Sequence, residues 1–260
     1  MSHPNQIAFV KLCSPILEDV YPHPTIAEMG AYDVNGSTRP LFKYAREYVG
    51  VDLTEGPSVD VVASAHEFGL ANHYDVVLAC EVFEHNPFWM ETFLNMIRIC
   101  RPGGTVLFTC ASRGRPEHGT ARTLALESPG TSSEGWNYYR NLNKRDFLKN
   151  VDLQLHFIDF EFFRVNPSQD LYFVGIKRAT LGQEKKTFHN WINEHRDRLH
   201  TGVNALNRSN RAGTHSLYGR IHSSSLYIAA LFLSDKHYQS LCYWGPLAKA
   251  KLLIALRGRK

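Results

Sequence analysis

The chain has 260 residues, of which 43% are hydrophobic and 21% charged, and these values suit a globular protein with a full core. No apolar run approaches the ~20 residues of a membrane-spanning helix, and the first residues do not form a secretory signal. The five cysteines form no C-x-x-C pair, which favours a reducing compartment. We therefore expect a cytoplasmic protein of one large domain, or of one domain plus an extension.

Charge divides the chain into two parts. Residues 1–179 hold 16 Lys and Arg against 21 Asp and Glu, whereas residues 180–260 hold 13 against 4. We predict a main domain over 1–179 and a basic helical C-terminal extension over 180–260. An excess of basic residues suits an anionic substrate, a membrane surface or a nucleic acid, although a solvated helical surface is also compatible with it.

Within residues 1–179, apolar runs of strand length alternate with helical patterns. The predicted elements are a helix at 14–20, strands at 25–29, 49–53, 59–63, 75–80, 104–111, 153–163 and 171–177, and helices at 39–48, 66–72, 87–100 and 143–150. Asn86 is the expected N-cap of the helix at 87–100. The order predicts an open, mostly parallel sheet that a final hairpin closes. Beyond it, residues 184–206 show an apolar stripe at helical spacing.

The loop after the first strand, IAEMGAYDVNGS (26–37), joins a strand to a helix that has Pro40 in its first turn. Open α/β sheets place their ligand at this carboxyl end of the strand. The loop contains neither G-x-G-x-x-G nor G-x-x-x-x-G-K-[ST], so nothing in it predicts a phosphate. The carboxylate of Glu28 suits a ligand that has a cationic or hydrogen-bond-donating part.

Three later segments extend this pattern. Asp52 ends YVGVD about twenty residues after Gly30, the spacing of a ribose-binding acid. The segments EMGAYDVNGS, YVGVDL, YDVVLACEVFEH and RPGGTVLFT, in this order, resemble the class I S-adenosylmethionine-dependent methyltransferases. The resemblance covers about residues 24–178. It implies a seven-stranded, mostly parallel Rossmann-like sheet with an antiparallel last strand, and S-adenosyl-L-methionine as the cofactor.

The resemblance also implies roles for individual residues. Glu28 would lie near the amino-acid end of the cofactor, Asp52 would accept both ribose hydroxyls, and His66 would border the adenine. The chain departs from the common pattern in having Tyr32 in place of the second glycine of G-x-G, and Ser64 where an acid is frequent. The cofactor-binding residues implied are Glu28, Gly30, Ala31, Tyr32, Asn35, Gly36, Ser37, Asp52, Leu53, Ala65, His66, Cys80, Glu81 and His85.

Methyl transfer is an in-line displacement, and it needs a base only when the acceptor must lose a proton. The loop after the fifth strand faces the acceptor in this family, so His118 is the preferred base, with Glu81 and Glu117 as the other catalytic candidates. A surface histidine is an equally good interpretation of His118. Residues that could contact an anionic or sugar-bearing acceptor are Arg113, Arg115, Tyr138, Tyr139 and Arg140.

The pairs His66-Glu67, Glu84-His85 and Glu117-His118 show no recognised zinc spacing, so no metal ligand is predicted, although Mg²⁺-assisted sugar methylation stays an alternative.

The favoured function is O-methylation of a sugar, a glycan or another small-molecule hydroxyl, and charge complementarity to residues 180–260 predicts an anionic acceptor. Methylation of RNA or another nucleic acid is an alternative. It is disfavoured because ACEVFEH lacks the Asp/Asn-Pro-Pro-Tyr/Phe type of motif that methylation of base amino groups uses, and because the chain shows no RNA-binding module. A cofactor-binding module without turnover is a third alternative. The basic helix expected from Pro246 could dock on the core, contact a membrane peripherally or form a homodimer interface, and we rank docking first.

Overall fold

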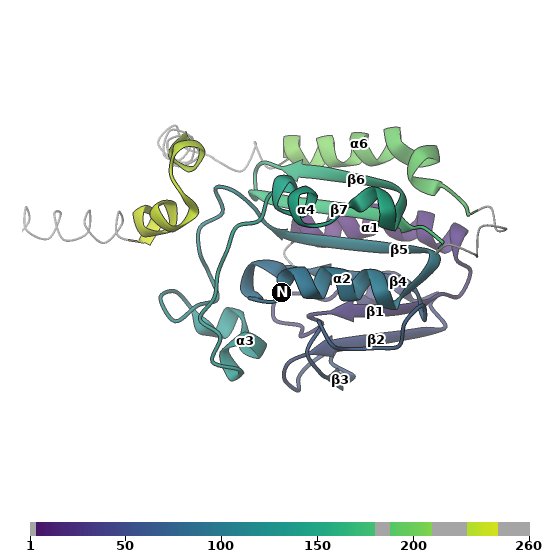
Figure 1. Cartoon of the computed structure of the whole chain (residues 1–260), viewed down its shortest axis with the longest axis horizontal. Helices are drawn as coiled ribbons and strands as arrows, with labels where there is room; N and C mark the ends of the chain where they lie inside the picture. The colour runs from purple at the N-terminus through teal and green to yellow at the C-terminus, as the bar shows by residue number, and fades with distance from the viewer. Residues whose placement is uncertain (1–3, 180–187, 210–227, 244–260) are drawn as a thin grey trace, which may run out of the picture.

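The computed structural model describes residues 4–179, 188–209 and 228–243. Its centre is a seven-stranded sheet in the order β3-β2-β1-β4-β5-β7-β6 (Figure 1). The strands are β1 (Thr25–Met29), β2 (Glu47–Asp52), β3 (Val61–Val62), β4 (Tyr74–Cys80), β5 (Cys100–Ala111), β6 (Phe157–Val165) and β7 (Asp170–Lys177). Strand β7 runs antiparallel to both of its neighbours, and the other pairings are parallel. The predicted fold class is confirmed.

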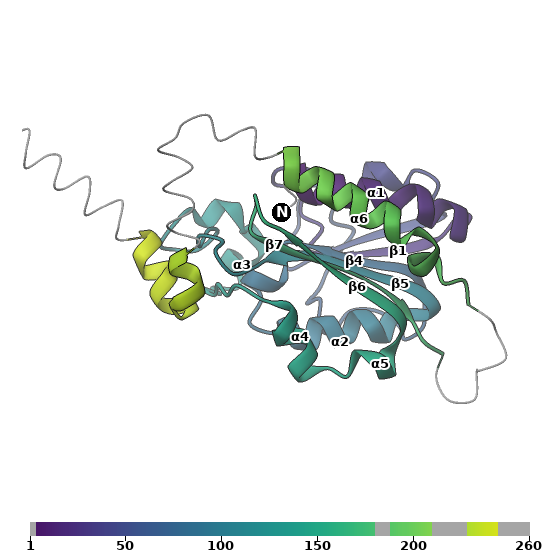
Figure 2. The same ribbon diagram turned by 90° about the horizontal axis from the view of Figure 1, so that it is seen from above.

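Helices cover both faces of the sheet, as Figure 2 shows from above. Helices α1 (Pro4–Val20) and α6 (Trp191–Ser209) lie on one face, and α2 (Trp89–Ile99), α4 (Lys144–Asn150) and α5 (Leu153–His156) lie on the other. Alternate residues of β4 face opposite layers: Val76 and Leu78 pack with α1 and α6, whereas Val77 and Ala79 pack with α2. Because both faces are buried, the strands read as continuous apolar runs.

The prediction of a helix at 39–48 is wrong. Only a short 3₁₀ turn, η1 (Arg39–Phe42), forms, and β2 begins at Glu47. Residues 47–51 pair in register with β1, from Thr25 opposite Glu47 onward. The helical spacing of LFKYAREY is real, but sheet pairing outweighs that local preference.

Two further predictions need correction. No helix forms at 66–72: residues 64–68 make a single turn, which Asn95 caps by donating to the carbonyls of Ala65 (2.8 Å) and Phe68 (2.9 Å). The strand predicted from residue 153 begins only at Phe157, because Asp152 accepts a hydrogen bond from the backbone N–H of Gln154 (3.1 Å) and starts α5. In both places a side chain forms hydrogen bonds with backbone groups, and the apolar pattern of the sequence does not reveal such bonds.

Other boundaries shift without changing the element. Helix α1 starts at Pro4 rather than at 14, and β3 has two residues rather than five. Of the helix predicted at 184–206, residues 184–187 lie outside the described residues, and the helix α6 begins at Trp191. Cys100 belongs to β5, and α2 begins at Trp89. Asn86 still stabilises the start of α2, because its Oδ1 accepts from the Phe88 N–H (2.8 Å) and its Nδ2 donates to Thr92 Oγ1 (2.8 Å).

Helix α6 completes the layer that α1 begins. Trp191 is fully buried and its Nε1 donates to Thr105 Oγ1 on β5 (3.1 Å). Arg196 pairs with Asp159 (2.8 Å) and with Glu161, both on β6. The division of the chain at residue 179 stays a prediction from composition, while in the structure α6 packs on the same sheet as the preceding residues.

Residues 228–243 contain two short helical segments that lie against the loop after β5. Tyr238 donates to the carbonyl of Gly114 (2.6 Å), and Gln239 Nε2 donates to that of Arg115 (2.9 Å). The helix expected from Pro246 lies outside the described residues. Within the described residues, no helix has the length and apolar character needed to cross a membrane.

Candidate active site

A pocket of about 640 Å³, its open mouth included, lies at the carboxyl ends of β1, β2 and β4. Since these strands are parallel, their ends meet at one edge of the sheet. Strand ends and the loops after them form one wall, and α3 (Pro129–Ser133) with its neighbours forms another. The lining residues are Gly30, Tyr32, Val34, Val51, Asp52, Leu53, Ala63, Ala65, His66, Glu81, Val82, His85, Asn86, Glu127, Ser128, Pro129, Gly130, Thr131 and Trp136.

Gly30 directly follows β1 in a conformation that requires glycine. Its φ is +74°, and a Cβ at this position would overlap Cγ2 of Val82. The backbone N–H groups of Gly30 and Ala31 both donate to the carbonyl of Val51, at 2.8 and 3.0 Å. The turn is therefore pinned to β2, and the chain leaves β1 along the pocket floor.

Asp52 presents a fixed carboxylate to the pocket. Its Oδ2 accepts from the backbone N–H of Tyr32 (3.0 Å), and its Oδ1 accepts from that of Leu53 (2.8 Å). Burial raises the pKa of this carboxyl, and the two backbone hydrogen bonds oppose that rise. Gly130 of α3 lies directly against it, since a Cβ there would overlap Oδ1.

The lining residues fit the nucleoside part of S-adenosylmethionine. Apolar side chains and the ring of Trp136 can pack on a flat base, and Asp52 can accept hydrogen bonds from ribose hydroxyls. Among the described residues that line this pocket there is no Lys or Arg. The pocket therefore suits a ligand with a sugar and a base better than one with phosphate groups.

Glu28, which the sequence predicts near the amino-acid end of the cofactor, is held by side chains of the loop and of β2. It is buried and does not line the pocket; its two carboxylate oxygens accept hydrogen bonds from Thr38 Oγ1 and the Tyr48 hydroxyl, both at 2.7 Å. Burial raises its pKa, and these two hydrogen bonds oppose the rise. The geometry gives Glu28 a positioning role, in which it ties the far end of the loop to β1 and β2.

Several other predicted cofactor residues also lie outside the lining. Ala31 and Cys80 are buried, and burial raises the pKa of the Cys80 thiol to about 12. Gly36 donates its N–H to Asp33 Oδ1 (2.7 Å) and so shapes the loop. Asn35 and Ser37 belong to the same loop and do not line the pocket either. The predicted residues that do line it are Gly30, Tyr32, Asp52, Leu53, Ala65, His66, Glu81 and His85.

Two buried acids follow β4. Glu81 has a φ of +57°, a strained backbone for a residue with a side chain, and its N–H donates to the Thr109 carbonyl (2.9 Å). Glu84 lies in η2 (Phe83–His85), and its Oε1 accepts from the Ala111 N–H (3.2 Å). The two side chains are 3% and 0% exposed and contact each other. Burial raises the pKa of both carboxyls, and the proximity of Glu84 raises that of Glu81 further.

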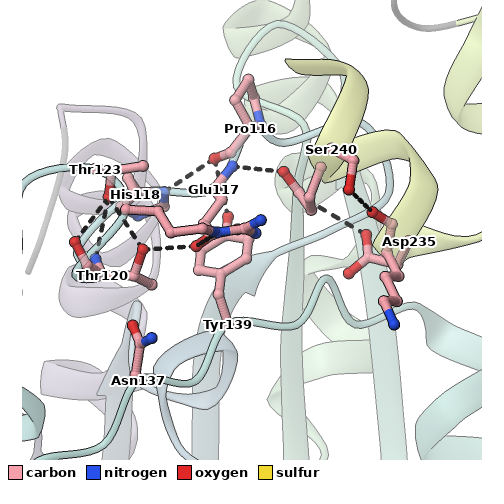
Figure 3. Close-up of polar contacts among 12 residues, drawn as sticks. Pro116, Glu117, His118, Thr120, Thr123, Asn137, Tyr139, Asp235 and Ser240 are labelled. Carbon is pink, nitrogen blue, oxygen red and sulfur yellow. Dashed lines mark hydrogen bonds and ion pairs between the residues drawn. The ribbon is translucent and has the colours of Figure 1, made fainter. Parts of the chain in front are cut away.

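Three aromatic rings gather beside these acids. The centroids of His85 and His118 are 4.9 Å apart, and Tyr139 lies 5.3 Å from His85 and 5.1 Å from His118. The carbonyl of Pro116 contacts Nδ1 of His118 (3.2 Å) and accepts from the Tyr139 hydroxyl (3.2 Å), as Figure 3 shows. The structure thus brings the predicted base His118 next to His85, which lines the pocket.

Other predicted catalytic and substrate residues point elsewhere. The Glu117 carboxylate accepts from Thr120 Oγ1 (2.6 Å) and pairs with Arg122 (Figure 3). Arg115 donates to the Ser168 carbonyl (2.7 Å) and lies 3.5 Å from the buried carboxylate of Asp170. Of the five predicted substrate residues, only Tyr139 joins the histidines. The remaining three, exposed or half-buried outside the pocket lining, are Arg113, Tyr138 and Arg140.

The second wall of the pocket was not identified from the sequence, which shows residues 112–142 only as a polar stretch. Within it, Ser128-Pro129 begins α3, and Trp136 packs against Phe88 with ring centroids 5.6 Å apart. A tryptophan and a Pro-Gly pair inside a polar stretch are the local signals that could have indicated an ordered segment.

Residues 34–108, from the loop after β1 through most of β5, match a family model described as a methyltransferase domain. A search of curated protein sequences finds no significant match. Similar solved structures include a putative methyltransferase from Bacillus halodurans C-125, with TM-score 0.43 and 16% identity over 60% of this chain and 71% of that one. Burkholderia thailandensis 1,6-didemethyltoxoflavin-N1-methyltransferase has a TM-score of 0.45 and 13% identity, over 66% of this chain and 79% of that one. The N-methyltransferase NodS from Bradyrhizobium japonicum WM9 has a TM-score of 0.45 and 11% identity, over 68% of this chain and 90% of that one.

Proposed function

We propose that this chain, which belongs to the class I S-adenosylmethionine-dependent methyltransferases and uses S-adenosyl-L-methionine, methylates a hydroxyl of a sugar, glycan or other small molecule. The observation that carries the proposal is the cluster of Glu81, Glu84, His85 and His118 at one end of the cofactor pocket. Imidazole and carboxyl groups are those that bind a hydroxyl and take its proton.

The cofactor supplies a methyl carbon that is already activated for displacement. The contribution of the protein is then to bind, orient and exclude water. Asp52, held by two backbone N–H groups, would accept the ribose hydroxyls, and the apolar wall with Trp136 would hold the base. Glu28 would act on the cofactor indirectly, because it fixes the loop after β1 through its hydrogen bonds with Thr38 and Tyr48.

A hydroxyl acceptor must lose its proton as the new oxygen–carbon bond forms. In the neutral tautomer of His118 that donates Nδ1–H to Pro116, Nε2 carries no proton and can accept one or bind a cation. Glu117 is not proposed for this step, since Arg122 and Thr120 occupy its carboxylate. His118 therefore remains the candidate base, and Glu81 is the nearby alternative.

The test is a methyl-transfer screen with labelled cofactor against sugar nucleotides, glycans, small phenols and RNA. We expect incorporation into a hydroxyl-bearing small molecule or glycan, with the methyl group located on oxygen by mass spectrometry and NMR. Calorimetry should show binding of S-adenosylhomocysteine and not of NAD. Incorporation into RNA alone would reject the proposed acceptor class, and tight binding of NAD without the S-adenosyl ligand would reject the cofactor.

A further inference from the structure

We propose that Glu84, His85 and His118 form a binding site for one divalent transition-metal cation at the end of the cofactor pocket. Each residue offers one ligand atom, a carboxylate oxygen or a ring nitrogen, and these atoms lie within 4.8 Å of one another. The sequence separates His118 from the other two by more than thirty positions, and only the fold brings the three together.

The distances need little change to accommodate an ion. Ligand atoms that each lie about 2.1 Å from one cation are separated by about 3 to 4 Å. Rotation of one or two side chains, which moves their ligand atoms by less than about an ångström, would bring the three ligand atoms to this separation. Glu84 and His85 are consecutive in η2, next to β4, and His118 is in the loop after β5, so the site joins two neighbouring strand ends.

The buried acids supply an independent indication. Glu84 is fully buried, and apart from contacts of its carboxylate with the Glu81 carboxyl and with its own backbone N–H, its Oε2 has no hydrogen-bond partner among the described residues; both oxygens of Glu81 likewise have none apart from the contact with Glu84. Two buried carboxyl groups in contact require a shared proton or a cation. The guanidinium of Arg115 attracts Glu81 and also lies 3.5 Å from Asp170, so one cation is shared among several buried acids. A cation bound by Glu84 would satisfy the remaining acceptor.

His118 is oriented as a metal ligand usually is. Ligating histidines generally donate their second ring N–H to a carbonyl or carboxylate, and Nδ1 of His118 contacts the Pro116 carbonyl at 3.2 Å. The loop itself is fixed from the C-terminal side, because the N–H of Glu117 donates to Gln239 Oε1 (2.7 Å). Figure 3 shows this support around Pro116, Glu117 and His118.

The donor set indicates the class of ion. Two imidazole nitrogens with one carboxylate suit Mn²⁺, Fe²⁺, Co²⁺ or Zn²⁺, whereas Mg²⁺ and Ca²⁺ prefer oxygen ligands throughout. Three protein ligands leave coordination positions open, where an acceptor hydroxyl could be held and polarised. With the cation bound, Nε2 of His118 would be a ligand and not the base, and Glu81 would be the group left to take the proton. Only this role in the reaction rests on the proposed function; the binding of the cation does not.

The experiment uses the full chain, freed of metal with a chelator and dialysed. Mn²⁺ is titrated and followed by electron paramagnetic resonance, with Zn²⁺ as a competitor, and S-adenosylhomocysteine affinity is measured on the same samples. We expect one Mn²⁺ per chain, displaced by Zn²⁺, and a rise in melting temperature when metal is added. His118→Ala and the near-isosteric Glu84→Gln should each weaken Mn²⁺ binding by at least about tenfold. His156→Ala, on α5, is the matched control and should bind Mn²⁺ as the wild type does.

The outcomes separate this inference from the proposed function. A wild-type chain that binds S-adenosylhomocysteine but neither Mn²⁺ nor Zn²⁺ overturns the metal site and leaves the methyltransferase proposal standing. A chain that binds Mn²⁺ through His118 but not the S-adenosyl ligand supports the metal site and rejects the cofactor. Unchanged Mn²⁺ affinity in folded Glu84→Gln and His118→Ala variants overturns the inference, since the ion would then be bound elsewhere.

Discussion

Two carboxylates at neighbouring strand ends perform different tasks, and the sequence alone did not distinguish them. Asp52 lines the pocket, while Glu28 is covered by Thr38 and Tyr48. Spacing along the chain predicted that both acids would lie at the correct edge of the sheet. It could not show that the hydroxyls of Thr38 and Tyr48 already donate hydrogen bonds to the carboxylate of Glu28. Tyr48 falls within the helix predicted at 39–48, which does not form.

The pocket carboxylate gives the first prediction. Asp52→Ala should weaken binding of S-adenosylhomocysteine by ~1–3 kcal/mol, because charge-assisted hydrogen bonds to the ribose are lost. Isothermal titration calorimetry measures the affinity. Glu55→Ala, an exposed acid three residues further along the chain, is the control and should bind as the wild type does. Equal affinity in Asp52→Ala and the wild type would remove Asp52 from the proposed cofactor site.

Glu28 gives a prediction about stability and pH. Glu28→Ala should lower the free energy of unfolding by ~1–3 kcal/mol, because the hydroxyls of Thr38 and Tyr48 lose their acceptor in a buried site. Burial raises the pKa of Glu28 in the folded state above its unfolded value. The folded chain therefore binds the proton more tightly, and the wild type loses stability as pH rises from the unfolded pKa through the folded one.

A neutral side chain removes this dependence. Glu28→Gln should consequently gain stability relative to the wild type between about pH 4 and neutral pH, as measured by urea unfolding at several pH values. A stability difference that stays constant with pH, or changes in the opposite direction, would show that the folded-state pKa of Glu28 is not raised.

At the scale of elements, apolar runs predicted all seven strands and the larger helices, because buried parallel strands and amphipathic helices leave clear patterns. The failures at 39–48, 66–72 and 153–156 arose where strand pairing or a capping side chain decided the structure. Motif spacing predicted the strand-end wall of the pocket. The wall that α3 forms depends on tertiary contacts of a polar stretch, which periodicity does not reveal.

Helix α3 gives a prediction of its own. Gly130→Ala should weaken S-adenosylhomocysteine binding by ~1–3 kcal/mol, since a methyl group there would overlap Asp52 Oδ1 and force α3 or the carboxylate to move. The melting temperature should change little, because α3 lies at the edge of the molecule (Figure 1). The control is Glu134→Ala, an exposed residue just after α3. Unchanged affinity in Gly130→Ala would show that α3 does not stay against Asp52 when the ligand binds.

At the scale of the whole molecule, charge and packing divide the chain differently. Composition predicted a separate basic unit after residue 179, yet α6 packs on the sheet, and residues 228–243 support the loop that carries His118. Arg196, one of the basic residues of the predicted extension, is paired with Asp159 and Glu161. The exposed arginines of α6 are Arg198 and Arg208, and both can act on an acceptor, whereas Arg211 lies outside the described residues.

An anionic acceptor should therefore be sensitive to these two charges. Replacing Arg198 and Arg208 by glutamine should raise the acceptor KM severalfold at low salt and leave cofactor affinity unchanged. The Debye length is ~8 Å at physiological ionic strength, so the effect of exposed charges should shrink as salt is added. A double variant of two exposed basic residues of α4, Arg145→Gln with Lys149→Gln, controls for the change in net charge. If the two double variants give the same acceptor KM at low salt, the arginines of α6 serve the surface of the fold or a subunit contact, and the acceptor is bound by the pocket residues alone.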